Sequence, residues 1–136
     1  MTRINVGISV KELSDEHLLA EHREIKRLTA LYDRFKSNIP SKFTLGKGHV
    51  LFFADKYLFT LKRYIDIYDE CINRGFDVVD YRDNWRKIPK PLMNDYKPSE
   101  DDRKMLIDRI NDRILNGRKD YYHYYGVKRN KKEFLL

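Results

Sequence analysis

Hydrophobic residues recur every three or four positions in three stretches of the chain, which is the spacing that places them on one face of an α-helix. The first helix is expected to begin after Ser14, whose side chain is suited to capping free backbone amides. Its apolar pattern becomes weaker towards Pro40. Its apolar face is expected to comprise Leu18, Ile25, Leu28, Thr29, Tyr32 and Phe35.

The second predicted helix spans residues 49–74 and is followed by Gly75, a residue common just beyond a helix end. The third is predicted to begin after Ser99, where acidic residues favour the first turn, and to end at Gly117. The expected buried face of the second helix comprises Val50, Phe53, Ala54, Tyr57, Leu58, Leu61, Ile65, Tyr68 and Ile72, with Cys71 beside it.

Residues 75–98 hold three of the four prolines, and they are expected to form a long ordered connection with a short turn near residues 78–83. No stretch shows the strict alternation that predicts a strand. The pattern therefore predicts an all-α fold. A compact single domain over residues 1–136 would contain three main helices, with the long connection between the second and the third.

Composition narrows the function further. Of the 136 residues 41% are hydrophobic, enough for a core, and 28 Lys and Arg against 21 Asp and Glu give a net charge of +7. An anionic partner is expected, with nucleic acid first and a membrane surface second. There is no apolar run of membrane-spanning length and no secretory signal pattern, and the single cysteine excludes an internal disulfide. These features suit a reducing cytosol.

Two features carry candidate chemistry. On the first helix His17, Glu24 and Arg27 share a face and Arg23 adjoins them, a pattern that fits either a binding site or a solvated face with ion pairs. At the start of the chain, Thr2 is small enough to allow removal of the initiator methionine. An α-amine has a pKa of about 7.7–8, so part of it is neutral and nucleophilic at physiological pH. A plain N-terminus is the alternative.

Other motifs indicate less. The tyrosines and cations of residues 118–132 would suit phosphates and bases, or would partly pack on the core. The segment Gly46-Lys47-Gly48 lacks the remainder of a phosphate-binding loop. The four histidines do not have metal-ligand spacing, and His22 is expected to be packed in the core.

Six segments of the chain, in order, match one known family: residues 2–5 (TRIN), 13–24 (LSDEHLLAEHRE), 45–50 (LGKGHV), 52–56 (FFADK), 70–76 (ECINRGF) and 121–126 (YYHYYG). With these segments the sequence resembles the phage-type endonuclease V family, the pyrimidine-dimer DNA glycosylases with abasic-site lyase activity. The resemblance implies that the Thr2 amine attacks C1′ of the damaged nucleotide, releases the base and forms an imine (a Schiff base). Glu24 would assist proton transfer and stabilise the cationic sugar, and elimination would cut the strand.

The resemblance also implies the partners. Damaged double-stranded DNA would be bound by a monomer without metal, cofactor or membrane, in the cytoplasm, at the nucleoid or in a phage-infected host cell. Arg3, Arg23 and Arg27 would hold phosphates around the lesion, and His17 would orient the site or contact the backbone. Arg109 and Arg113, four positions apart, match a family arginine and a family lysine and would mainly supply affinity for duplex.

Four departures from the family leave the lesion undecided. They are His22 in place of a tyrosine, Lys26 in place of a proline, a shorter segment 28–44, and Tyr121 in place of a tryptophan. Two alternatives therefore stay open, a glycosylase for another modified base and a non-catalytic basic DNA-binding domain.

Overall fold

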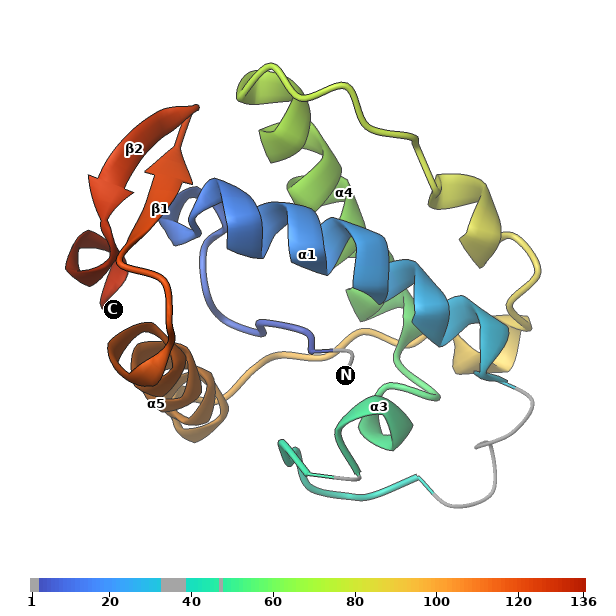
Figure 1. The fold of residues 1–136 in the computed structure, drawn as a ribbon. Helices are drawn as coiled ribbons and strands as arrows, with labels where there is room; N and C mark the ends of the chain where they lie inside the picture. The colour runs from blue at the N-terminus through green and yellow to red at the C-terminus, as the bar shows by residue number, and fades with distance from the viewer. Residues whose placement is uncertain (1–2, 33–38, 47) are drawn as a thin grey trace.

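A computed structural model describes residues 3–32, 39–46 and 48–136, and in these ranges the chain is mainly helical (Figure 1). The α-helices are α1 (Asp15–Ile25), α3 (Gly48–Phe52), α4 (Tyr57–Asn73) and α5 (Glu100–Asn116). A hairpin is formed by β1 (Tyr121–Tyr124) and β2 (Val127–Asn130). Short 3₁₀ turns are Val10–Glu12, Lys26–Ala30, Arg82–Trp85, Lys90–Leu92 and Lys131–Phe134. None of the described helices has the length and hydrophobicity of a membrane span.

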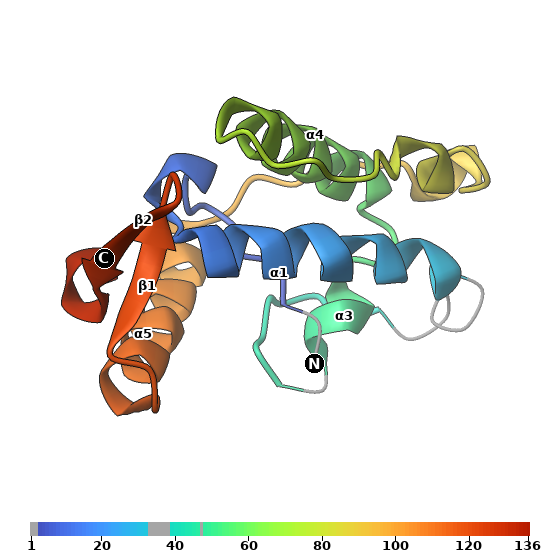
Figure 2. The same ribbon diagram turned by 45° about the horizontal axis from the view of Figure 1, so that its top comes forward.

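Helix α1 lies in the middle of the molecule and organises the rest. It packs against α4 on one side, and the start of α1 contacts strand β1 (Figures 1 and 2). The N-terminal segment from Arg3 onward passes on the side of α1 that faces α5 and α3. Three parts of the chain that are remote in sequence are thereby brought to one side of α1.

The predicted helix starts are confirmed. Ser14 Oγ accepts a hydrogen bond from the His17 amide at 3.1 Å, and Ser99 and Asp102 exchange hydrogen bonds in a capping box at the start of α5. These contacts satisfy amides that have no partner inside a helix. The first helix is shorter than predicted, because α1 gives way to a 3₁₀ turn at Lys26–Ala30. Phe35, expected on its apolar face, lies outside the described residues.

The prediction of one continuous second helix is wrong. It is divided into α3 and α4, and Lys56 between them has a non-helical conformation (φ −125°, ψ 41°). The connecting segment 75–98 supplies partners at this break: Asn94 donates to the Asp55 carbonyl at 2.8 Å and accepts from the Phe59 amide at 3.2 Å. Long-range backbone contacts of this kind leave no signal in local periodicity. The segment itself is ordered, as predicted, and the indole of Trp85 donates to Thr60.

The predicted buried face of α4 is also partly wrong. Ile72 is 48% exposed, whereas Arg63, Glu70 and Arg74 are buried. These charged residues are enclosed in ion pairs with one another or with residues of α1. Hydropathy treats charged residues as exposed to solvent. The predicted buried face of the helix therefore differs from the observed one. Cys71 is fully buried, as expected.

The all-α prediction missed the hairpin near the C-terminus. Strands β1 and β2 pair antiparallel with Tyr124 opposite Val127, and the turn residues Tyr125 and Gly126 both have positive φ, 52° and 77°. Two positive φ values are typical of a two-residue hairpin turn, which usually carries Asn-Gly. Here the amides of Tyr125 and Gly126 are bound by the Asp15 carboxylate, at 3.1 and 2.8 Å. A contact with α1 thus stabilises a turn that the local sequence does not predict.

Candidate active site

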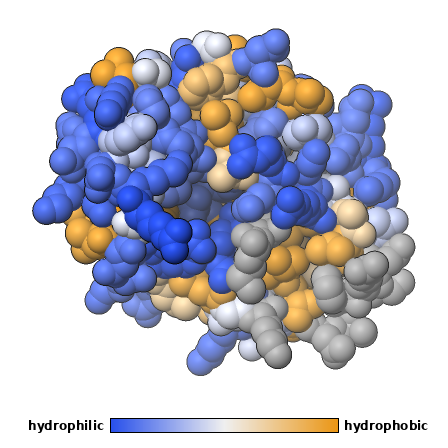
Figure 3. All heavy atoms as spheres, in the orientation of Figure 1, coloured by the Kyte–Doolittle hydropathy of each residue, from blue (hydrophilic) through white to orange (hydrophobic). Residues whose placement is uncertain are grey.

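A small polar pocket of about 170 Å³ opens between α1, α5 and the N-terminal segment. Figure 3 shows a hollow on this face of the molecule, bordered largely by hydrophilic residues. The pocket is lined by Arg3, Asn5, His17, Ala20, Glu21, Glu24, Arg109, Ile110 and Arg113.

Five of the residues predicted from the sequence meet in this pocket: Arg3, His17, Glu24, Arg109 and Arg113. Arg23 on α1 and Arg27 in the following 3₁₀ turn are exposed, and neither is among the residues that line the pocket. Thr2 lies outside the described residues, and the chain enters the described part at Arg3, on the pocket wall. Arg109 and Arg113, expected mainly to supply affinity for duplex, line this pocket together with Arg3 and Glu24.

The pocket places three arginines near Glu24, whereas Glu21, the other carboxylate of the lining, is paired with Arg63. Burial and the neighbouring Arg113 lower the pKa of Arg3, and Glu24 opposes that shift. Burial, Arg113 and Arg3 likewise lower the pKa of Arg109, again opposed by Glu24. Three guanidinium groups that disfavour one another favour a bound anion, and phosphate is an anion that arginine side chains bind well.

His17 is fixed at the pocket edge. Its Nδ1 lies 2.8 Å from Ser14 Oγ, and its ring lies 5.0 Å from the ring of Tyr122 in β1. Burial lowers the pKa of His17, with Glu16 opposing. The imidazole is therefore neutral near pH 7, and its position connects the pocket with the hairpin.

The N-terminal segment is held at the pocket by residues that were not predicted from the sequence. Glu21 accepts from the Asn5 side chain at 2.7 Å and from the Asn5 amide at 3.3 Å. Arg63 holds Glu21 through two nitrogens at 2.8 and 2.9 Å, and His49 accepts from the Ile4 amide at 2.9 Å. A charged residue among the apolar positions of α1 was the available signal for Glu21.

A comparison with known families identifies the class of protein. The model of a family described as pyrimidine dimer DNA glycosylase matches residues 1–84, more than half of the chain. The chain belongs to that family. The resemblance to the phage endonuclease V family is thereby confirmed, and DNA repair by a glycosylase is the function of this class. The match contains α1, α3 and α4, whereas Arg109, Arg113 and the hairpin lie beyond it.

Two departures from the family have structural explanations in this glycosylase. His22 is buried, as predicted, and its Nε2 donates to the Val79 carbonyl at 3.0 Å. Lys26 lies over the ring of Tyr81, with 3.8 Å between Nζ and the ring centroid. Both residues therefore attach the end of α1 to the long connection and contribute nothing to the pocket lining. Among the described residues, no cluster of His, Cys, Asp or Glu is arranged to hold a metal ion.

The buried imidazole of His49 predicts a pH dependence of stability. Burial lowers the pKa of His49 to about 4; Arg3 and Arg109 add to the shift, while Thr44 and Glu21 oppose it. An unfolded histidine titrates near 6.5, so the folded state favours the neutral ring. This contribution to the free energy of unfolding is complete above pH 6.5 and is lost as the pH falls towards 4.

Protonation of this ring is expected to reduce the free energy of unfolding by about 2–3 kcal/mol between pH 7 and pH 4.5. Urea unfolding of the wild type and of His49→Gln at both pH values measures it, because the other titrating groups are common to both proteins. The variant should lose less stability on acidification by about that amount. Equal losses in the two proteins would contradict the assignment of a neutral buried His49.

Proposed function

We propose that this glycosylase excises ultraviolet-induced pyrimidine dimers from duplex DNA and then cleaves the strand as an abasic-site lyase, through an imine formed by the Thr2 α-amine. The observation that supports the proposal most strongly is the pocket that joins Glu24 to Arg3, Arg109 and Arg113 next to the N-terminal segment. A nucleophile two positions before Ile4 and a carboxylate among phosphate-binding groups are the components that this reaction requires.

The proposed reaction proceeds in two stages. The neutral amine attacks C1′ while the C1′–N glycosidic bond breaks, and the bonding electrons leave with the base. Loss of the amine protons and opening of the sugar ring at O4′ then give the imine. Removal of a C2′ proton expels the 3′ phosphate and cuts the strand. Glu24 stabilises the cationic sugar and transfers protons, and neither a metal nor a soluble cofactor takes part.

The pocket arginines are proposed to bind the lesion-strand phosphates, and Arg23 and Arg27 to contact the duplex outside the pocket. Arg109→Ala should therefore lower the single-turnover rate on damaged duplex by about tenfold or more. Arg27→Ala should mainly weaken binding to both damaged and undamaged duplex. It should also reduce the slope of log K against log salt by about 0.9. Titrations across a salt series together with single-turnover rates separate the two effects. A larger loss of rate from Arg27→Ala than from Arg109→Ala would contradict this division.

The function is tested with three duplexes: ultraviolet-irradiated, undamaged, and containing one abasic site. The proposal predicts glycosidic-bond cleavage and strand cleavage on the first, strand cleavage on the third, and neither on the second. Cleavage of the abasic duplex alone would indicate a glycosylase for a different modified base. Binding of all three duplexes without any cleavage would indicate a non-catalytic DNA-binding domain and would refute the proposal.

The proposal also includes the state and place of action. The protein is expected to act as a monomer, on DNA of the cytoplasmic nucleoid or of a phage-infected cell. Sedimentation with a single-lesion duplex should give a 1:1 complex.

A further inference from the structure

The amide of Ile4 has an unusual hydrogen-bond partner. It donates to Nε2 of His49, which is 45 positions away in the sequence, at 2.9 Å. Both residues are fully buried. The N-terminal segment is thus attached to α3 by a side chain rather than by a backbone ladder.

The surroundings of His49 determine which nitrogen carries its hydrogen. Nδ1 lies 3.0 Å from the carbonyl oxygen of Thr44, which only accepts, so the hydrogen is on Nδ1. Nε2 then has a free lone pair for the Ile4 amide. The rings of Phe43 and Phe53 contact the imidazole edge-on, with centroids at 5.4 and 5.3 Å, and fix its plane. The ring is therefore preorganised as an acceptor.

A second attachment acts on the next residue. Asn5 is bound through its backbone and side chain by Glu21, which is itself held by Arg63. Ile4 and Asn5 are thereby fixed from α3 and from α1, respectively. Arg3, the preceding residue, lines the pocket with Glu24. Two peptide bonds separate Ile4 from Thr2, so the anchor at Ile4 limits the positions that the Thr2 amine is able to reach.

We propose that His49 is a positioning residue for the imine chemistry: by accepting the Ile4 amide, it holds the N-terminal segment in the register that presents the Thr2 amine to the pocket. This inference rests on the proposed function of the Thr2 amine. A misplacement of about 1 Å between reacting groups lowers a rate by about 100-fold, so an anchor this close to the nucleophile has a large effect on chemistry. DNA affinity depends on the arginines and changes less.

Three variants of His49 separate the hydrogen bond from simple packing. His49→Gln places an acceptor near the position of Nε2, and His49→Phe keeps the ring volume without an acceptor. His49→Asn keeps a donor for Thr44 but is too short for Ile4. Three quantities are measured for each variant. They are the single-turnover rate at which borohydride traps the adduct on an abasic-site duplex, the Kd for that duplex without borohydride, and the Tm of the protein.

Phe and Asn should slow trapping by about 30-fold or more with less than about a threefold change in Kd, and Gln should restore the rate to within a few-fold of the wild type. If the Phe variant does not fold, the His49→Asn and His49→Gln variants provide the same comparison. Trapping at the wild-type rate by Asn or Phe would overturn the inference. So would a Gln variant that is as slow as Asn, because packing alone would then explain the loss.

Two further measurements keep the inference separate from the proposed function. Nitrogen-15 chemical shifts of the His49 ring should place its hydrogen on Nδ1 at pH 7, and a hydrogen on Nε2 would refute the anchor whatever the reaction is. The wild-type adduct is also mapped by peptide sequencing. An adduct away from residue 2 would refute the proposed nucleophile, whereas an adduct on residue 2 with unchanged rates in all variants would refute the role of His49 alone.

Discussion

Replacing Glu24 by glutamine should lower the single-turnover rate of glycosidic-bond cleavage by about 100-fold or more, while affinity for damaged duplex is retained or increases. Glutamine keeps the size and hydrogen bonding of Glu24 but removes the negative charge that would stabilise a cationic sugar. Loss of an anion beside Arg3, Arg109 and Arg113 does not weaken attraction to phosphates. The measurement is the rate of glycosidic-bond cleavage at saturating enzyme, with Kd for the damaged duplex determined in parallel.

Asp108→Asn is the matched control, because it makes the same change in net charge on an exposed position of α5 outside the pocket lining. Its rate should stay within about twofold of the wild type. If Glu24→Gln cleaves the glycosidic bond at close to the original rate, or if both variants lose this activity equally, Glu24 does not have the proposed role.

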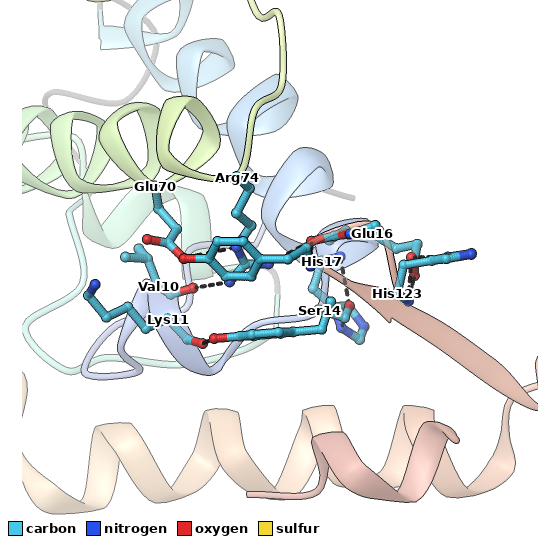
Figure 4. A network of polar contacts seen from close by, with 12 residues as sticks. Val10, Lys11, Ser14, Glu16, His17, Glu70, Arg74 and His123 are labelled. Carbon is cyan, nitrogen blue, oxygen red and sulfur yellow. Dashed lines mark hydrogen bonds and ion pairs between the residues drawn. The ribbon is translucent and has the colours of Figure 1, made fainter. Parts of the chain in front are cut away.

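The largest effect on stability is expected at Arg74. Figure 4 shows its side chain between Glu70 and the start of α1, and it is fully buried. It donates to Asp15 and Glu70, both at 2.9 Å, and to the Val10 carbonyl at 3.1 Å. Burial alone would lower the pKa of Arg74, but the hydrogen bonds to Glu70 and Asp15 raise it. The guanidinium is thus the counter-charge for two enclosed carboxylates.

Arg74→Met should reduce the free energy of unfolding by about 3–5 kcal/mol, because it leaves Asp15 and Glu70 buried without a cation. Urea unfolding measures the loss. The exposed ion pairs of Arg82 provide the comparison, since Arg82→Met should change stability by less than about 1 kcal/mol. Similar losses from both variants would show that the enclosed cluster contributes no more than a surface pair.

The same substitution should loosen the hairpin. Asp15 accepts from the amides of the turn, and Glu16 accepts from the His123 amide at 2.8 Å (Figure 4). Without Arg74 the position of Asp15 is no longer fixed. Amide hydrogen exchange in β1 and β2 should therefore accelerate more than exchange in α5.

Local features of the fold were predictable, and non-local ones were not. Ser14 and Ser99 identified helix starts because a cap acts within one turn of its own position. The face of α4 was misassigned because Arg63 and Arg74 are buried by partners on α1, which hydropathy does not take into account. The hairpin was missed because carboxylates of α1, rather than a typical turn sequence, satisfy its backbone.

The candidate site was predictable only through the family resemblance. Spacing along α1 grouped His17, Glu24 and Arg27, but the structure groups the first two with Arg3 and Arg109 instead. Nothing in local periodicity brings α5 to this side of α1. His49 gave no signal of its own, because its importance depends on a contact with the backbone of Ile4. Glu21 was marked only by its charge among apolar positions, and its contact with the Asn5 backbone was not predictable.

The central claim is that the Thr2 amine forms the imine, and borohydride trapping with peptide mapping tests it most directly. The protein, with and without Met1, is incubated with ultraviolet-irradiated or undamaged duplex in the presence of borohydride, and the adduct is digested and sequenced. The account predicts a covalent adduct with irradiated duplex only, mapped to residue 2 of the protein that lacks Met1. An adduct on an internal lysine, or full activity with Met1 retained, would contradict it.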